Sequence, residues 1–315
     1  MSTVVEKKKL SFGIVLDSTT IVDSEYASLV DIARAPLHIT LGNETRDEND
    51  WTIKEIVDGY DTKVCKTSCP STGEFVKAFK EIFAKGYDDI VCIPMSKGIS
   101  GTYQAAKVAA STFEGKEGHI HIVSVPLANF GITTLLNASL KYLKEGLSAA
   151  QYAAVLERMG NSSSQIWTLG SLEYLYKGGR LSKLSFAIGS LFRIKPIIGV
   201  SPKDGKLTVE KKVRTFPEVD KFMCERLNQF FEKFNRVYVR FINLGDENQV
   251  ATLKTTILTE HPNLENSEIS EVGPLFTVHL GRNGYGICII GDEPKANSNS
   301  STKNWTDIFH LNHHN

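Results

Sequence analysis

The sequence predicts an α/β protein of two domains, and three observations support this fold class. Its 315 residues are too many for one small domain and suit two domains of ordinary size. Short apolar runs alternate with amphipathic helical patterns through the first half, which predicts a parallel sheet covered by helices on both faces. The stretch 160–164, Gly-Asn-Ser-Ser-Ser, is the most loop-like interior segment, so we place the domain boundary there.

The first half is expected to alternate strands and helices. Four apolar runs have the length of strands and lie at 12–17, 36–41, 88–95 and 119–125. Between the second and third runs, five apolar side chains recur at the spacing of an amphipathic helix: Phe75, Val76, Phe79, Ile82 and Phe83. An Ala-rich helix is expected at 101–114, and two more helices near 128–145 and 148–160.

The second half is expected to mix strands with longer helices. Its predicted strands lie at 165–169, 197–200, 206–213, 236–243, near 267–273 and at 285–290. Short helical pieces extend to about 193, and a turn at Asp204-Gly205 makes the second and third strands a hairpin. Apolar residues from Val219 to Phe234 line one face of a helix, and another helix ends near 259.

These elements define the expected domains. An N-terminal tail covers 1–9, the first α/β domain 10–162 and the second 163–291. Residues 292–315 are rich in Asn and Ser and poor in aliphatic side chains, which predicts a disordered tail. We assign His310, His313 and His314 to that tail rather than to a metal site.

Composition narrows the classes of function. Lys plus Arg number 36, as do Asp plus Glu, so the net charge is zero and nucleic acid is not an expected partner. The first apolar run is too short for a signal peptide, and no window approaches the ~18 apolar residues of a membrane span, so a cytoplasmic protein is expected. The five cysteines are scattered, which favours reduced thiols over a zinc site.

The first candidate site is a hydroxyl-rich stretch at 67–74. Ser71 and Glu74 have the spacing of a capping box for the helix that follows, which explains both residues. The two hydroxyls upstream, Thr67 and Ser68, are not explained by the cap. They belong either to a polar turn or to a binding site.

The second candidate is the loop 96–104, which follows a buried strand and opens a helix. Free backbone N–H groups and the helix dipole make such a helix start an anion site, and ligands of parallel sheets bind beyond the carboxyl ends of the strands. Ser100 is either a ligand-binding residue or only the N-cap of the helix. A nucleophile elbow would need Gly at position 102, which is Thr, and the Gly-Lys-Ser/Thr of a phosphate loop is absent. We therefore predict that the loop binds a small anionic head group.

Three further positions complete the candidates. Arg180 follows Gly178-Gly179, a pair that permits close packing or a positive φ, and its guanidinium could bind a carboxylate or phosphate. Asp17 ends the first strand but lacks the second carboxylate of an aspartyl phosphatase at position 19, so we interpret it as orienting its loop. His279 precedes the last strand and, alone, is typical of a structural histidine.

Together, these segments resemble the DegV family of bacterial lipid-binding proteins. The matching segments follow the family's order from about residue 12 to 290. They are Asp17-Ser-Thr, Thr67-Ser68-x-Pro70-Ser71, Gly98-Ile-Ser-Gly-Thr-Tyr-Gln104, Leu172-Glu-Tyr-Leu, Lys177-Gly-Gly-Arg180, Leu191-x-x-Ile-Lys-Pro196, Lys212-Val-Arg-Thr215, and Gly273-Pro with His279-x-Gly281.

The resemblance implies two α/β domains with a tunnel for a long-chain fatty acid between them. The carboxylate would be bound by Thr67 or Ser68, by Ser100 and by the N–H of Gly101, with Arg180 and His279 nearby. It implies a carrier without catalytic residues, metal or cofactor, which presents the fatty acid to a dihydroxyacetone-kinase-like fatty acid kinase. That kinase makes an acyl phosphate for phospholipid synthesis, and lipid exchange would involve transient membrane contact.

The sequence departs from the family pattern at three places, and two other functions are also compatible with it. Lys97 replaces a usual Ser, Pro126-Leu127 replaces an Asp-Ser pair, and Arg282 adds a cation that we expect near the head group. One rival is a small-molecule hydrolase that uses Ser100 with His279. The other is a carrier of a different lipid-like ligand, or one without a kinase partner.

Overall fold

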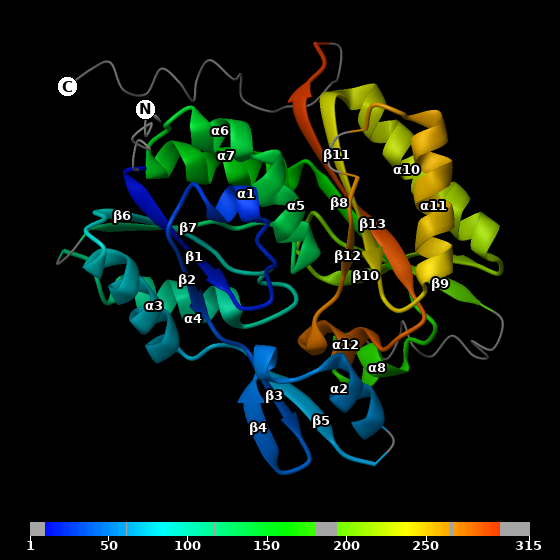
Figure 1. The fold of residues 1–315 in the computed structure, drawn as a ribbon, viewed down its shortest axis with the longest axis horizontal. Coiled ribbons are helices and arrows are strands. Elements are labelled where there is room, and N and C mark those ends of the chain that lie inside the picture. Colours follow the sequence, from blue (N-terminus) through cyan, green and yellow to red (C-terminus); the bar gives the residue numbers. More distant parts are fainter. Residues whose placement is uncertain (1–9, 61, 116–117, 181–193, 265–266, 297–315) are drawn as a thin grey trace, which may run out of the picture.

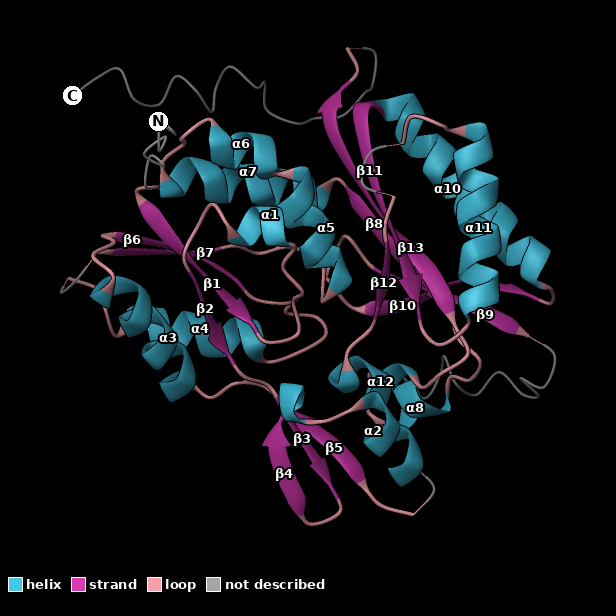
Figure 2. Ribbon diagram, viewed as in Figure 1, coloured by secondary structure: helices cyan, strands magenta, loops and turns pink. Residues whose placement is uncertain are grey.

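The computed structural model describes residues 10–60, 62–115, 118–180, 194–264 and 267–296. Two large sheets alternate with layers of helices, as Figures 1 and 2 show. Helices α3 and α4 cover one face of the first sheet, and α10 and α11 cover one face of the second. Helix α7 packs against strands of both sheets, and α5 packs against α7 and the second sheet, so the two halves share one helical layer.

The first sheet is parallel, as predicted, and has the strand order β2-β1-β6-β7. Its strands are β1 (Phe12–Asp17), β2 (Ile32–Ala35), β6 (Asp89–Ile93) and β7 (His119–Ile122). Every residue of β1 is buried, which explains why this strand is an unbroken apolar run. The carboxyl ends of β1 and β6 meet at one edge, where the Asp17 carboxylate accepts a hydrogen bond from Met95 N at 2.8 Å.

The second sheet is mixed and has the strand order β10-β9-β8-β13-β11-β12. Its strands are β8 (Ser163–Thr168), β9 (Lys195–Val200), β10 (Leu207–Val213), β11 (Phe234–Asn243), β12 (Ile269–Glu271) and β13 (Tyr285–Pro294). The predicted hairpin is confirmed, because β9 and β10 pair antiparallel. Only β11 and β12 pair parallel in this sheet.

A third sheet of three short strands was not predicted. It has the order β4-β3-β5 and lies below the two large sheets in Figure 1. Its strands are β3 (His38–Leu41), β4 (Glu44–Asp47) and β5 (Cys65–Ser68). The strand predicted at 36–41 therefore begins at His38 and belongs to this antiparallel sheet rather than to the parallel one.

The longer helices follow the predicted periodicity, but one prediction was divided and four short helices were missed. They are α1 (Ser24–Ala27), the 3-10 helix η1 (Glu48–Asp50), α2 (Ile53–Gly59), α3 (Thr72–Ala84), α4 (Thr102–Ser111), α5 (Phe130–Ala138), α6 (Leu140–Lys144), α7 (Ala149–Asn161), α8 (Glu173–Lys177), α10 (Phe216–Lys233), α11 (Glu247–Glu260) and α12 (Pro274–Leu280). The helix expected at 128–145 is two helices that meet at Ser139. The helices α1, η1 and α2 were not expected, nor was α12, which carries His279.

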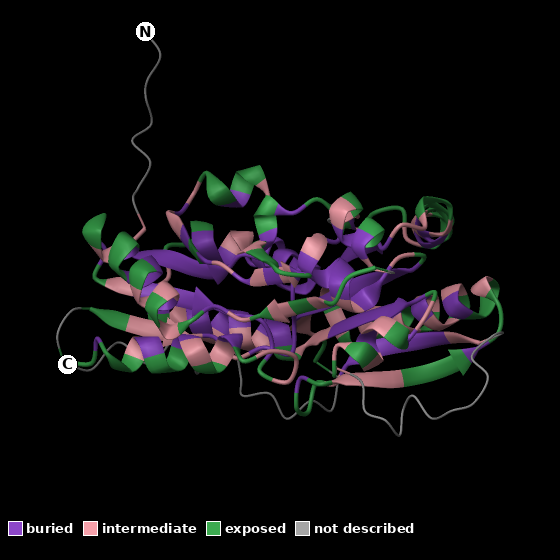
Figure 3. Ribbon diagram, turned by 90° about the horizontal axis from the view of Figure 1, so that it is seen from below, coloured by how far each residue is buried: buried purple, intermediate pink, exposed green. Residues whose placement is uncertain are grey.

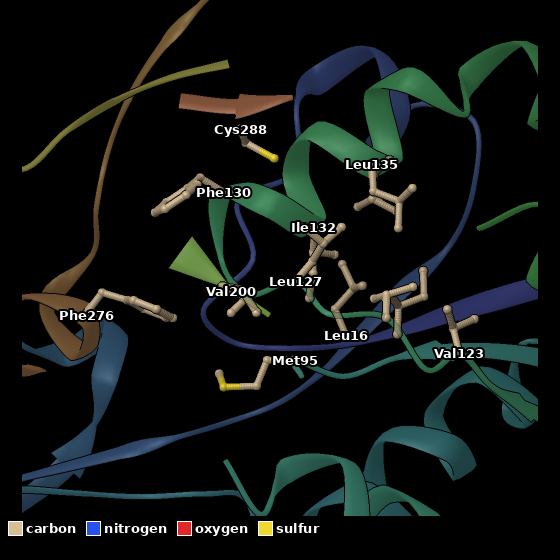
Figure 4. Packing of buried hydrophobic residues seen from close by; sticks show 14 of the residues in the cluster. Leu16, Met95, Val123, Leu127, Phe130, Ile132, Leu135, Val200, Phe276 and Cys288 are labelled. Atoms are coloured by element: carbon tan, nitrogen blue, oxygen red, sulfur yellow. The ribbon is translucent and has the colours of Figure 1, made fainter. Parts of the chain in front are cut away.

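The core is divided by the sheets into three clusters. The largest contains side chains from both halves, from Phe12 on β1 to Ile290 on β13. It includes Met95, Val200 and Phe276, which come from three segments that are distant in sequence (Figure 4). A second cluster lies between the mixed sheet and α10 and α11, and a third lies between the parallel sheet and α3 and α4. Figure 3 shows the buried strands inside and the exposed helical surfaces outside.

Two sequence boundaries differ from the structure. The predicted loop at 160–164 is reduced to Ser162, because α7 ends at Asn161 and β8 starts at Ser163. Strand β13 continues to Pro294, so the tail prediction is wrong at its first residues. Asp292 is fully buried and pairs with Lys141 and Arg158 of the first half, each at 3.0 Å. The tail at 1–9, the three tail histidines and the family segment 191–193 lie outside the described residues.

None of the helices in the described part of the chain combines the length and hydropathy needed to cross a bilayer.

Candidate functional site

The predicted site residues come together where the two halves meet below the large sheets. Strand β5 contributes Thr67 and Ser68, the loop before α4 contributes Ser100, and the turn after α8 contributes Arg180. Helix α12 packs against β5, α8 and α2, which brings His279 to the same place. These side chains line one cavity of about 40 Å³.

Thr67 and His279 are in direct contact although 212 residues separate them. Thr67 Oγ1 lies 2.7 Å from His279 Nε2, a hydrogen-bond distance. The other ring nitrogen, Nδ1, is buried and has no hydrogen-bond partner among the described residues. Gly178 makes this packing geometrically feasible, since a Cβ there would lie 2.4 Å from Nδ1. The isolated histidine of the sequence is therefore part of the site.

Burial and a neighbouring positive charge keep the imidazole of His279 neutral. Burial, and to a smaller extent the nearby Arg180 charge, lower the pKa of His279 to about 3. Burial also lowers the pKa of the Arg180 guanidinium from its ordinary value. Among the described residues that line the cavity, Arg180 is thus the positively charged one at neutral pH, beside an uncharged histidine.

Arg180 is positioned by the paired glycines before it. Gly179 has a φ of +71°, and the Arg180 side chain donates a hydrogen bond to the carbonyl oxygen of Gly178. Both roles expected of the glycine pair, close packing and a positive φ, are confirmed. Within the described residues, no carboxylate forms an ion pair with Arg180. This cation can therefore attract an external anion.

Ser100 takes part in the start of α4. Its Oγ accepts from Thr102 N at 3.3 Å and lies 2.9 Å from Thr102 Oγ1, but Ser100 is not the N-cap that the sequence suggested, because it lies one residue before that position. It also lines the cavity. Gly101 is the N-cap residue, and a Cβ there would lie 3.3 Å from Cys69 Sγ. No hydrogen bond joins Ser100 to His279 in the described structure, so the arrangement does not form the dyad of a hydrolase.

The cavity changes character from its mouth to its interior. Arg180 also borders two outer grooves of about 560 and 900 Å³, and it shares the first with Thr67 and His279 and the second with Ser100. The interior is lined mainly by apolar side chains that border neither groove, namely Leu37, Met95, Ala128, Leu275 and Phe276. The polar mouth and apolar interior match the two ends of an amphipathic ligand.

Sequence reasoning missed most of this interior. Leu275 and Phe276 lie one helical turn before His279 on α12, on the same face. Gly273 and Pro274 at the start and Gly281, with a φ of +70°, at the end are ordinary helix boundary signals that could have indicated α12. Trp167 and Gln165 of β8 also line the cavity, but no local pattern marks them.

Asp17 and Arg282, the other two residues interpreted from the sequence, lie outside the cavity lining. Asp17 orients its own loop as expected, because its carboxylate accepts hydrogen bonds from Thr19 N and from the Thr19 hydroxyl. Arg282, which was expected near the head group, is engaged in contacts of its own. Arg282 pairs with Glu271 at 3.2 Å, packs against Gly245 and does not line the cavity.

Comparison with known sequences assigns a family. The sequence model of the DegV family, described as an uncharacterised protein family, matches residues 11–292. A DegV domain-containing protein of Staphylococcus aureus strain COL is 27% identical over 279 residues, which are 88% of this chain and 98% of that protein. A second DegV domain-containing protein of the same strain is 26% identical over 286 residues, 90% of this chain and 98% of its own length.

Solved structures with this fold include proteins described by their ligands. A DegV family protein from Thermus thermophilus, described as fatty acid binding, has a TM-score of 0.80 at 24% identity and covers 89% of this chain and 99% of its own. A fatty acid binding DegV family protein from Streptococcus agalactiae has a TM-score of 0.80 at 21% identity, with coverages of 90% and 99%. The Fatty Acid Kinase B3 protein of Streptococcus pneumoniae, loaded with linoleic acid, has a TM-score of 0.78 at 18% identity, with coverages of 89% and 99%.

Proposed function

The chain belongs to the DegV family, and from that premise we propose that it is a carrier of one long-chain fatty acid. In this proposal it presents the carboxyl group to a separate, dihydroxyacetone-kinase-like fatty acid kinase, which forms the acyl phosphate used in phospholipid synthesis. The observation that carries the proposal is the pair Thr67 and His279, joined at 2.7 Å at the polar mouth of an apolar cavity between the halves.

The apolar interior supplies the affinity for the chain. Each buried CH2 group contributes on the order of 0.8 kcal/mol. The transfer of an acyl chain of about sixteen carbons from water to an apolar cavity therefore has a large favourable free energy. The cavity of about 40 Å³ has room for only a few water molecules. Binding a long chain therefore requires the lining side chains, Met95 and Phe276 among them, to move apart. Met95 is suited to this because methionine is flexible.

The mouth can satisfy a carboxylate without an obligatory ion pair. A buried carboxylate left unpaired costs several kcal/mol, so hydrogen-bond donors are required. With the single ring proton of His279 on Nε2, the Thr67 oxygen accepts from the histidine and its own O–H can turn to the ligand. Ser100 is a further donor in the same cavity, whereas Gly101, whose N–H was expected to bind the carboxylate, lines the second outer groove instead.

A kinase requires access to the carboxylate from outside. Arg180 borders both outer grooves as well as the cavity, and the groove it shares with Thr67 also contains Lys63 and Lys66. A guanidinium at this position can stabilise the negative charge that develops during phosphoryl transfer. The similarity to a Fatty Acid Kinase B3 protein supports this role, and the fatty acids named with other similar structures support the ligand class.

Head-group recognition can be tested by comparing palmitic acid with hexadecanol, which has the same chain without a charge. Both compounds are used to displace a fluorescent fatty acid from the purified protein. We expect the acid to bind at least about tenfold more tightly, because hydrogen bonds to a charged group contribute about 1.5–3 kcal/mol. Equal affinity of acid and alcohol, or no displacement by either, contradicts the proposal.

The kinase step needs a second assay. A purified fatty acid kinase, ATP and palmitic acid are incubated with and without the carrier, and acyl phosphate is trapped with hydroxylamine. Product is expected only when the carrier is present. Binding of the acid without carrier-dependent product with any fatty acid kinase tested would retain the lipid carrier and reject the kinase role.

A further inference from the structure

The indole N–H of Trp167 is a buried donor without an acceptor among the described residues. Trp167 lies on β8, is 2% exposed and lines the cavity. Buried tryptophan N–H groups normally find a partner, and the exceptions call for an explanation. Trp51 shows the ordinary case, since its Nε1 donates to the carbonyl oxygen of Ile39 at 3.2 Å.

The immediate surroundings of Trp167 offer no substitute acceptor. Gln165 is on the same face of β8, but its amide pairs with Ala128, from which it accepts at 3.2 Å and to which it donates at 3.1 Å, and no hydrogen bond joins it to the indole in the described structure. The ring of Phe130 meets the indole edge to face, with centroids 6.2 Å apart. Met95 and Phe276 complete an apolar environment in the cavity.

The position of Trp167 separates it from the head-group residues. Thr67, Ser100, Arg180 and His279 each border an outer groove as well as the cavity, whereas Trp167 borders the cavity alone. A ligand whose carboxylate lies at the mouth therefore brings its acyl chain, and not its head group, to the indole.

We infer that Trp167 is a specificity residue that selects fatty acids with an oxygen on the acyl chain, such as a hydroxyl or keto group. This inference rests on the proposed function and names the class of ligand for the same cavity. A saturated chain covers the indole N–H with CH2 groups and leaves the donor unsatisfied. A chain oxygen accepts the hydrogen bond, so the oxygenated acid is expected to bind about tenfold more tightly than its saturated equivalent.

The test compares stearic acid with hydroxystearic acids that carry the hydroxyl near the carboxyl end, in the middle or near the methyl end. Affinities are measured by displacement for the wild-type protein and for Trp167→Phe, which removes the N–H and keeps an aromatic ring beside Phe130. Trp51→Phe is the matched control, because it removes an indole N–H that is already paired outside the cavity. Indole ¹H–¹⁵N resonances are recorded for each complex.

We expect one hydroxystearic acid to be preferred about tenfold over stearic acid by the wild type and by Trp51→Phe. In Trp167→Phe this preference should disappear, whatever the absolute affinities of the two acids. In the wild type, only the preferred acid should move the Trp167 indole proton downfield. Tight binding of stearic acid with no preferred hydroxy acid, or a preference that survives in Trp167→Phe, overturns the inference and leaves the carrier function intact. If none of the acids binds, the carrier function fails and the inference fails with it.

Discussion

Thr67→Val should impair both the binding of fatty acid and the stability of the fold. The substitution keeps the β-branched shape of the side chain and removes the hydroxyl that lies 2.7 Å from His279 Nε2. A hydrogen bond to a charged group contributes about 1.5–3 kcal/mol, so the affinity for palmitic acid should fall about 10- to 150-fold. Both nitrogens of a buried imidazole would then lack partners, which should cost about 1–3 kcal/mol of unfolding free energy.

The assays are displacement of a fluorescent fatty acid and urea unfolding. Thr67→Ser retains the hydroxyl and should stay close to the wild type in affinity. Thr45→Val is the matched control, since Thr45 is an exposed hydroxyl on β4 of the same small sheet and does not line the cavity. An unchanged affinity in Thr67→Val, with palmitic acid still bound by the wild type, would refute the assignment of Thr67 to the head group.

Three further predictions concern the other mouth residues. Ser100→Ala should weaken palmitic acid binding by about tenfold or more, whereas a loss of about 1 kcal/mol in unfolding free energy with unchanged affinity would leave Ser100 only its hydrogen bond with Thr102 N. Arg180→Ala should abolish most carrier-dependent acyl phosphate formation with near-normal lipid affinity, and a parallel loss of both would make Arg180 a carboxylate ligand instead. His279 should make stability fall as pH drops from 6.5 toward 3, because its pKa of about 3 in the folded state lies below that of the unfolded chain. Its contribution to the fall in unfolding free energy is about 2 kcal/mol between pH 7 and 5. In urea unfolding, the stability of His279→Gln should therefore depend less on pH than that of the wild type, and parallel pH profiles would contradict the burial argument.

The parts of the fold that could be predicted are those whose pattern is local. Strand β1 is buried along its whole length, and α3 has apolar residues at helical spacing, so each is visible in a short window. The glycine pair 178–179 likewise indicated a close approach and a positive φ, and both are present. Such elements require no knowledge of their partners.

The small sheet could not be predicted in this way, because its strands depend on tertiary pairing. Strand β4 has the sequence Glu-Thr-Arg-Asp and β5 the sequence Cys-Lys-Thr-Ser, neither of which has the apolar pattern of a strand. They form because β3 pairs with both, for example His38 with Asp47 and with Ser68. This sheet carries Thr67 to the mouth of the cavity.

Charge partners across the fold were equally inaccessible from the sequence. Arg282 looked like an added cation at the head group, but its guanidinium is paired with Glu271. Asp292 looked like the start of a tail, but it is buried against Lys141 and Arg158 from the other half. In both cases the partner is set by a contact between elements rather than by a neighbouring residue.

The central claim is that the cavity between the halves holds one fatty acid by its carboxylate. The most direct measurement is extraction of the purified full-length protein, followed by mass spectrometry and quantification of fatty acid per chain, alongside Thr67→Val purified in the same way. We predict about one fatty acid per chain in the wild type and a clearly lower content in the variant. Repeated extractions that yield no stoichiometric fatty acid, from protein that also fails to take up added palmitic acid, would contradict the claim.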